Sequence, residues 1–101
     1  MLAKFKSDIV TVATAGTAVA LGSGLVRKLK IKALAGNAGV VGVGDSGVDS
    51  TNWYELAAGD ELILDNTQIA DLSDSYEFDL ADHYVDAANN GDAVSISYLR
   101  F

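Results

Sequence analysis

Short apolar runs separated by clusters of glycine, asparagine and aspartate dominate this chain, and helical periodicity is nearly missing. Breaks of this kind about every eight to twelve residues are typical of a β-sandwich or barrel. We therefore predict an all-β fold, a single compact antiparallel β-sandwich of jelly-roll-like form with about eight short strands. The runs that indicate strands lie near residues 8–14, 17–22, 25–34, 39–44, 52–56, 60–65, 75–80, 83–87 and 93–100.

Three of these runs alternate apolar and polar residues, which places the two kinds of side chain on opposite faces of a strand. They are residues 28–32, 76–80 and 94–98, and we expect half-solvated strands of antiparallel sheets there. Turns are expected where glycine, asparagine and aspartate gather, and a short helical turn is expected at 68–72 within a longer loop. The predicted turns lie at residues 35–37, 57–60 and 89–92.

The chain of 101 residues has the length of one domain, so we expect residues 1–101 to share a single core. Cysteine is absent, which excludes a disulfide framework and a thiol nucleophile. Stability must therefore come from packing, and burial against neighbouring subunits would add to it.

Charge is divided unevenly along the chain. Residues 1–44 carry six basic side chains and one acid, for a net charge of +5, whereas residues 45–101 carry one arginine and thirteen acids, for a net charge of −12. We expect basic and acidic strands to pair within one sheet. The remaining acidic surface would repel nucleic acid, so we predict no nucleic-acid partner.

An uncharged stretch of 18 residues, 9–26, invites comparison with a signal peptide or a membrane-spanning helix. Seven of its residues are small and polar or glycine, and it lacks a compact leucine-rich centre. We therefore predict neither a processed signal nor a membrane partner.

Motifs for catalysis, metal binding and nucleotide binding are weak. His83, beside Asp82, is the sole histidine, and no serine lies in a nucleophile-elbow motif. We therefore predict that the protein is not an enzyme; a small hydrolase using His83 is the alternative.

A helical calcium loop beginning at Asp45 would need Glu at its twelfth position, where Leu56 stands. We predict no metal and no cofactor, and leave open a looser calcium site in loops 45–52 or 65–75. The segment Gly42-Val43-Gly44 lacks a phosphate-loop lysine and a helix start, and we expect its glycines to allow close backbone packing or a turn.

Six residues are candidates for contact with a partner protein. Lys28, Lys30 and Lys32 form a stripe that could pair with acids such as Glu77 and Asp79, protect an exposed edge, or dock on an acidic protein. Large aromatic side chains after a polar loop could plug the core or anchor an interface, and a terminal apolar one could contact a neighbouring subunit. These are Trp53, Tyr54 and Phe101.

Four segments, in their order along the chain, resemble small structural proteins of tailed-phage virions. AGTAVAL at 15–21 is similar to AGTxVxL, and IKALAGNAGVVGVG at 31–44 to IKAxxxNxGxVYVG. TNWYELAAGD at 51–60 is similar to TNGYxLxPGE, and DLADHYVDA at 79–87 to DLSxIYVDA. The chain departs from these patterns at Gly42, where Tyr is usual, at Trp53, where Gly is usual, and at Ala58, where Pro is usual.

The resemblance implies a β-sandwich that assembles on the phage particle as an oligomer and binds other virion proteins without catalysis. It favours a homotrimeric capsid decoration or cement protein on the capsid exterior, which binds the major capsid protein and stabilises the shell by bridging its subunits. The alternative is a structural or adhesion module of the neck, tail or head fibre that binds protein or glycan. In that role Trp53 and Tyr54 would stack on sugar faces.

Overall fold

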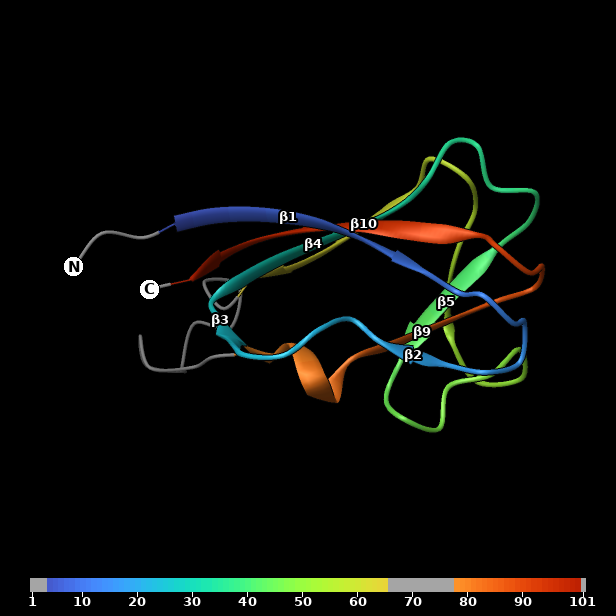
Figure 1. Cartoon of the computed structure of the whole chain (residues 1–101), viewed down its shortest axis with the longest axis horizontal. Helices are drawn as coiled ribbons and strands as arrows, with labels where there is room; N and C mark the ends of the chain where they lie inside the picture. Colours follow the sequence, from blue (N-terminus) through green and yellow to red (C-terminus); the bar gives the residue numbers. More distant parts are fainter. Residues whose placement is uncertain (1–3, 66–77, 101) are drawn as a thin grey trace.

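The computed structural model describes residues 4–65 and 78–100, and these form ten β-strands and one short 3-10 helix. The helix, η2 (Leu80–Asp82), lies between β8 and β9 along the chain. Figure 1 shows the strands packed as two layers. The strands are β1 (Lys4–Thr11), β2 (Val19–Ala20), β3 (Leu25–Val26), β4 (Lys28–Ala33), β5 (Val41–Gly44), β6 (Tyr54–Leu56), β7 (Glu61–Asp65), β8 (Phe78–Asp79), β9 (Tyr84–Ala87) and β10 (Ala93–Arg100).

Two four-stranded antiparallel sheets make up the sandwich. Sheet A has the order β1-β10-β4-β7 and sheet B the order β2-β9-β5-β6, while β3 and β8 form a separate short pair. Without this pair, the eight remaining strands, counted along the chain, follow the orders 1-8-3-6 and 2-7-4-5. This interleaving of two sheets is the topology of a jelly roll. The predicted fold class is therefore confirmed, with two more strands than the eight expected.

The predicted strand boundaries agree best where alternation is strongest. Strand β10 spans the predicted residues 93–100, whereas β1 begins four residues before the predicted start of its run. The predicted run 25–34 is divided into β3 and β4 at Arg27, whose backbone N–H donates to the Leu99 carbonyl at 3.2 Å. The helical turn expected at 68–72 lies outside the described residues.

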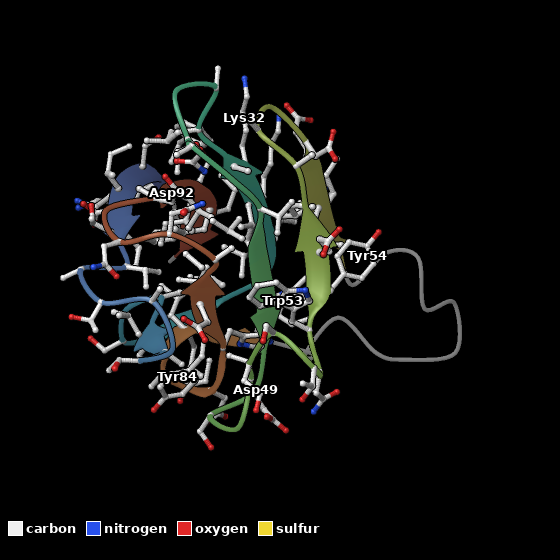
Figure 2. All side chains as sticks on the ribbon, turned by 90° about the vertical axis from the view of Figure 1, so that its right-hand side faces the viewer. Lys32, Asp49, Trp53, Tyr54, Tyr84 and Asp92 are labelled. Atoms are coloured by element: carbon white, nitrogen blue, oxygen red, sulfur yellow. The ribbon has the colours of Figure 1, made fainter. Side chains whose placement is uncertain are left out.

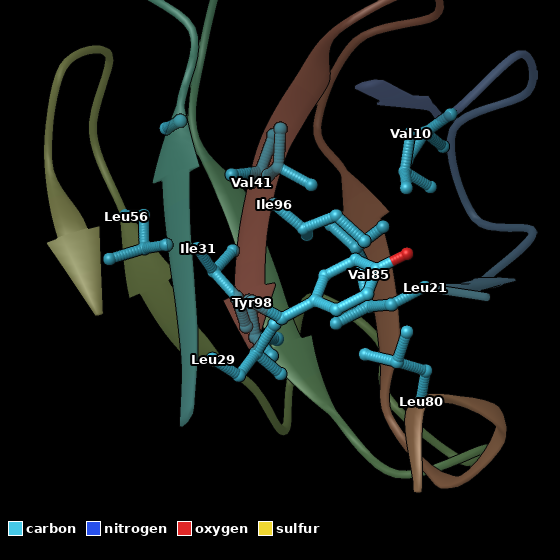
Figure 3. Packing of buried hydrophobic residues seen from close by; sticks show 14 of the residues in the cluster. Val10, Leu21, Leu29, Ile31, Val41, Leu56, Leu80, Val85, Ile96 and Tyr98 are labelled. Carbon is cyan, nitrogen blue, oxygen red and sulfur yellow. The ribbon is translucent and has the colours of Figure 1, made fainter. Parts of the chain in front are cut away.

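The core lies between the inner faces of the two sheets, as Figure 3 shows. Alternate residues of β4 and β10 point into it, which confirms the pattern predicted for 28–32 and 94–98. Each fully buried aliphatic side chain contributes about 1.5–3 kcal/mol, so this layer accounts for most of the favourable folding free energy. The core residues are Val10, Val12, Leu21, Val26, Leu29, Ile31, Ala33, Val41, Val43, Leu56, Leu80, Val85, Ala87, Val94, Ile96 and Tyr98.

Two turns that are distant in sequence are joined by side chains at one end of the sandwich. The buried carboxylate of Asp92 accepts hydrogen bonds from the backbone N–H groups of Ala38 and Gly39, each at 2.9 Å. Asn37 donates to the Ala93 carbonyl and accepts from the Ala93 N–H, both at 2.9 Å. These bonds hold the turn that follows β4 against the start of β10.

Candidate partner-binding surface

The three lysines of the predicted stripe lie together on the solvent side of sheet A. Lys28, Lys30 and Lys32 are exposed, whereas the residues that alternate with them on β4 are buried in the core. Strand β4 lies inside the sheet between β10 and β7. The hypothesis that the stripe protects a sheet edge is therefore wrong, and the lysines project from the middle of a sheet face.

An acidic strand does pair with this basic strand, as the charge distribution predicted. Strand β7 pairs with β4, and Lys30 Nζ lies 3.2 Å from Glu61 Oε1. The suggested partner Asp79 lies instead on β8, which pairs with β3, and Glu77 lies outside the described residues. Both members of the Lys30–Glu61 pair are partly exposed, so the pair contributes at most about 1 kcal/mol and neutralises only part of the stripe.

Apolar side chains flank the lysines on the same face. Phe5, Ile9 and Ile63 are 69%, 58% and 55% exposed. In the register of the sheet, β10 places Ser97 and Leu99 between the residues of β1 and those of β4. We call this surface the outer face of sheet A; it comprises Phe5, Ser7, Ile9, Lys28, Lys30, Lys32, Glu61, Ile63, Ser95, Ser97 and Leu99.

A shallow hollow of about 370 Å³ opens on the outer face of sheet A. Phe5, Ile63 and Leu99 give it apolar walls, while Lys28 and Lys30 place cationic groups beside them. Exposed apolar groups clustered in this way are typical of surfaces that bind other proteins. The arrangement suits an apolar side chain of a partner that carries carboxylates nearby.

Trp53 lies on the opposite layer, against the solvent side of sheet B. A Cβ atom added at Gly42 would overlap the Trp53 ring, so the indole covers β5 at a position where that strand has no side chain. The Trp53 Nε1–H donates to Glu55 Oε1 at 3.3 Å. The expectation that Gly42 allows close backbone packing or a turn is wrong, because the glycine makes room for an aromatic side chain.

Tyr54 does not form one aromatic platform with Trp53. It begins the edge strand β6 and is 57% exposed. Figure 2 shows Trp53 lying across β5 and Tyr54 pointing away from the sandwich. Of the other candidates, the lysines lie on the opposite sheet and Phe101 lies outside the described residues.

His83 is bound within the loop structure around η2. Its Nδ1 lies 2.8 Å from the Asp79 carbonyl oxygen, and its ring meets the Phe78 ring edge-on, with centroids 6.0 Å apart. The backbone N–H of His83 donates to the Leu80 carbonyl and closes the helix. These contacts give His83 a structural role at the end of η2.

The carboxylates of loop 45–52 stabilise turns. Asp45 accepts a hydrogen bond from the Gly47 N–H at 2.9 Å, and Asp49 accepts from the Thr51 hydroxyl at 2.6 Å and from the Thr51 N–H at 2.8 Å. The Thr51 hydroxyl, followed by its N–H, holds the pKa of Asp49 below its usual range. In residues 4–65 and 78–100 there is no group of three or more acidic or histidine side chains placed to hold a metal ion.

Comparisons of the chain with protein-family models, with curated proteins and with solved structures found no match. Within the described residues, no helix is long and apolar enough to span a membrane. The uncharged stretch 9–26 contains the end of β1 and the short strands β2 and β3.

Proposed function

We propose that this protein is a structural protein of a tailed-phage virion that decorates the outside of the assembled capsid and stabilises it. The observation that carries the proposal is the outer face of sheet A, which combines a lysine stripe with exposed apolar side chains and a hollow of about 370 Å³. The resemblance of four segments to virion proteins supports it from the sequence. By analogy of fold, jelly rolls are common in viral capsid and lectin domains.

The chemistry of this face favours an acidic protein partner over nucleic acid. The whole chain carries a net charge of −7, so its long-range field repels a phosphate backbone even though the three lysines outnumber Glu61 on this face. Phe5 and Ile63 offer apolar contact area, which a protein surface can bury. In the proposed role the major capsid protein supplies this acidic surface.

The mechanism is mechanical. A decoration protein that contacts more than one capsid subunit binds the assembled shell better than it binds separate subunits. Binding then favours the assembled state by mass action, so the shell withstands more heat or internal pressure. A homo-oligomer strengthens this effect because each added copy brings another outer face of sheet A to the shell.

Binding to shells that lack the protein tests this proposal. The double variant Lys32→Glu/Ile63→Ser is expected to lose affinity by about tenfold or more, because it reverses a charge and removes an apolar contact on the outer face of sheet A. The release of DNA on heating should then occur at the temperature of undecorated particles. The measurements are cosedimentation with shells and a thermal release assay.

A matched control separates this face from general effects of charge and apolarity. Lys4→Glu/Leu25→Ser changes one exposed lysine and one aliphatic residue that is 54% exposed, close to the 55% of Ile63, at other places on the surface. It should bind shells as the unmodified protein does. Equal binding by both double variants, or no binding by the unmodified protein, would contradict the proposal.

A further inference from the structure

Strand β1 is an unusually open edge of sheet A. It is eight residues long, and among the strands of residues 4–65 and 78–100 it pairs with β10 alone, so no described strand pairs with the backbone N–H and C=O groups of its other side. Residues 4–9 and Thr11 are exposed, and Val10 is the one residue of this strand that enters the core. Figure 1 shows the first half of β1 extending beyond the labelled strands of sheet B. Such an edge is a template for pairing with another strand.

The register with β10 assigns each side chain of β1 to one face. Phe5 lies opposite Leu99 and Ile9 opposite Ser95, so the odd-numbered residues face the solvent side of sheet A. Lys6 lies opposite Tyr98 and Asp8 opposite Ile96, so the even-numbered residues face the side of the core. Lys6 and Asp8 make no side-chain hydrogen bond or ion pair with any residue in the described part of the chain.

The pattern of β1 is self-complementary about Ser7. We propose that two copies of this chain pair antiparallel through β1, with Ser7 opposite Ser7 of the second copy. In this register Phe5 meets Ile9 of the second copy on one face, and Lys6 meets Asp8 of the second copy on the other. The two-fold symmetry repeats each pair, which gives two apolar pairs and two pairs of opposite charge.

Other registers that keep the two solvent faces on the same side are poorer. A shift by one residue in each chain toward the N-terminus centres the pair on Lys6. This register keeps an opposite-charge pair, Lys4 with Asp8, but it places two lysines opposite each other and loses the apolar pair, because Phe5 then meets Ser7. A shift the other way centres it on Asp8, which places two carboxylates opposite each other and Ile9 opposite Ser7. Like charges directly opposite each other destabilise a strand pair, so the register centred on Ser7 is favoured.

Charges on an edge strand usually prevent pairing, which is the simpler explanation of Lys4, Lys6 and Asp8. A protective edge is best served by charges of one sign, because these repel a second copy. In β1 a positive and a negative charge stand at equal distances from Ser7 and so attract their counterparts. The exposed Phe5 and Ile9 stand at equal distances as well, and a protective function does not account for them.

The pairing would join two four-stranded sheets into one sheet of eight strands, with both outer faces of sheet A on the same side. It is closed after two copies, so it predicts a dimer in solution in place of the trimer that we favour from the sequence. A strand pair of this length is a small interface, and we expect dissociation in roughly the micromolar range. The inference is independent of the proposed function, because it concerns the protein alone.

Sedimentation equilibrium over a concentration series tests the pairing. The mass of the unmodified protein should rise to twice the 10.5 kDa of the chain. Asp8→Lys and Lys6→Asp, made singly, should each weaken the dimer at least about tenfold, because each places like charges opposite each other. The double variant Lys6→Asp/Asp8→Lys should recover most of the affinity, since it exchanges the partners without changing the pattern.

The control is Asp82→Lys, which makes the same change of charge as Asp8→Lys at an exposed residue of η2 and should leave the dimer unchanged. Circular dichroism should show all four variants folded, because the altered side chains are exposed. A monomer at every concentration, a mass of three chains, or a dimer insensitive to Asp8→Lys would overturn the inference. Failure of the double variant to recover would overturn the register.

Discussion

Replacing Gly42 with tyrosine is expected to lower the free energy of unfolding by about 2–4 kcal/mol. Any side chain at this position meets the Trp53 ring, which covers β5 there. The indole must therefore leave the sheet, and it loses both its packing and its hydrogen bond to Glu55. Urea denaturation followed by circular dichroism measures the loss.

The same substitution should be harmless once Trp53 is removed. In the virion-protein pattern that the sequence resembles, Tyr is usual at the position of Gly42 and Gly at the position of Trp53, so this chain carries the aromatic ring on the residue that precedes the neighbouring strand β6. In a Trp53→Gly background, Gly42→Tyr should restore cover over the sheet and remove a glycine from a strand interior. We expect a coupling free energy of at least about 2 kcal/mol in the double-mutant cycle.

The control for this cycle is Gly36→Tyr, because a Cβ atom at Gly36 meets no atom within 4 Å. This turn variant should change stability by about 0.5 kcal/mol or less, with or without Trp53. If the effects of Gly42→Tyr and Trp53→Gly on the free energy of unfolding were additive, the two aromatic side chains would not compete for the same place on the sheet.

Asp92→Ala is the second substitution with a large expected effect. Its carboxylate is 5% exposed and accepts the N–H groups of both Ala38 and Gly39, which would lose their partner together. Leaving two backbone donors unsatisfied should cost about 2–4 kcal/mol and lower the melting temperature by roughly 10 °C or more. Thermal unfolding followed by circular dichroism measures the shift.

Asp45→Ala provides the comparison for Asp92→Ala. Asp45 is an exposed turn aspartate that accepts one backbone N–H, so its removal should cost about 0.5 kcal/mol or less. If the two variants were equally stable, the bonds from Ala38 and Gly39 would not be what holds this end of the sandwich together.

Much of the fold could be predicted because its signals are local. Alternation of period two in 28–32 and 94–98 identifies both the strands and the face that each buries, and β4 and β10 follow that pattern. The sequence pattern does not indicate the start of β1. Residues 4–8 are largely polar and exposed on both faces, so they do not show the alternation of apolar and polar positions that a buried face produces. Turn residues located the ends of strands but could not indicate that Arg27 interrupts one.

Strand pairing depends on contacts between segments that are distant in the sequence, and local sequence patterns do not determine which strands pair. Two acidic runs, 60–65 and 75–80, could each pair with the lysine stripe, and the clean alternation of 76–80 favours the second of them. The structure pairs Lys30 with Glu61 of β7. The position of β4 inside the sheet, which makes the stripe part of a face, also follows only from the topology.

The contact between Trp53 and Gly42 left one signal in the sequence. The departures from the virion-protein pattern at these two positions are reciprocal, since one gains an aromatic ring where the other lacks it. Considered separately, each suggested only a local change of a turn or a surface. Considered together, they predict that positions 42 and 53 are neighbours on one face, as they are.

The number of copies of this protein per purified virion, relative to the major capsid protein, tests the proposed decoration function most directly. Quantitative mass spectrometry gives this ratio without any variant. A protein spread across the shell by its outer face of sheet A should be present at about one copy per capsid subunit. A few to a few dozen copies per particle would contradict decoration and would place the protein at the neck, tail or fibres.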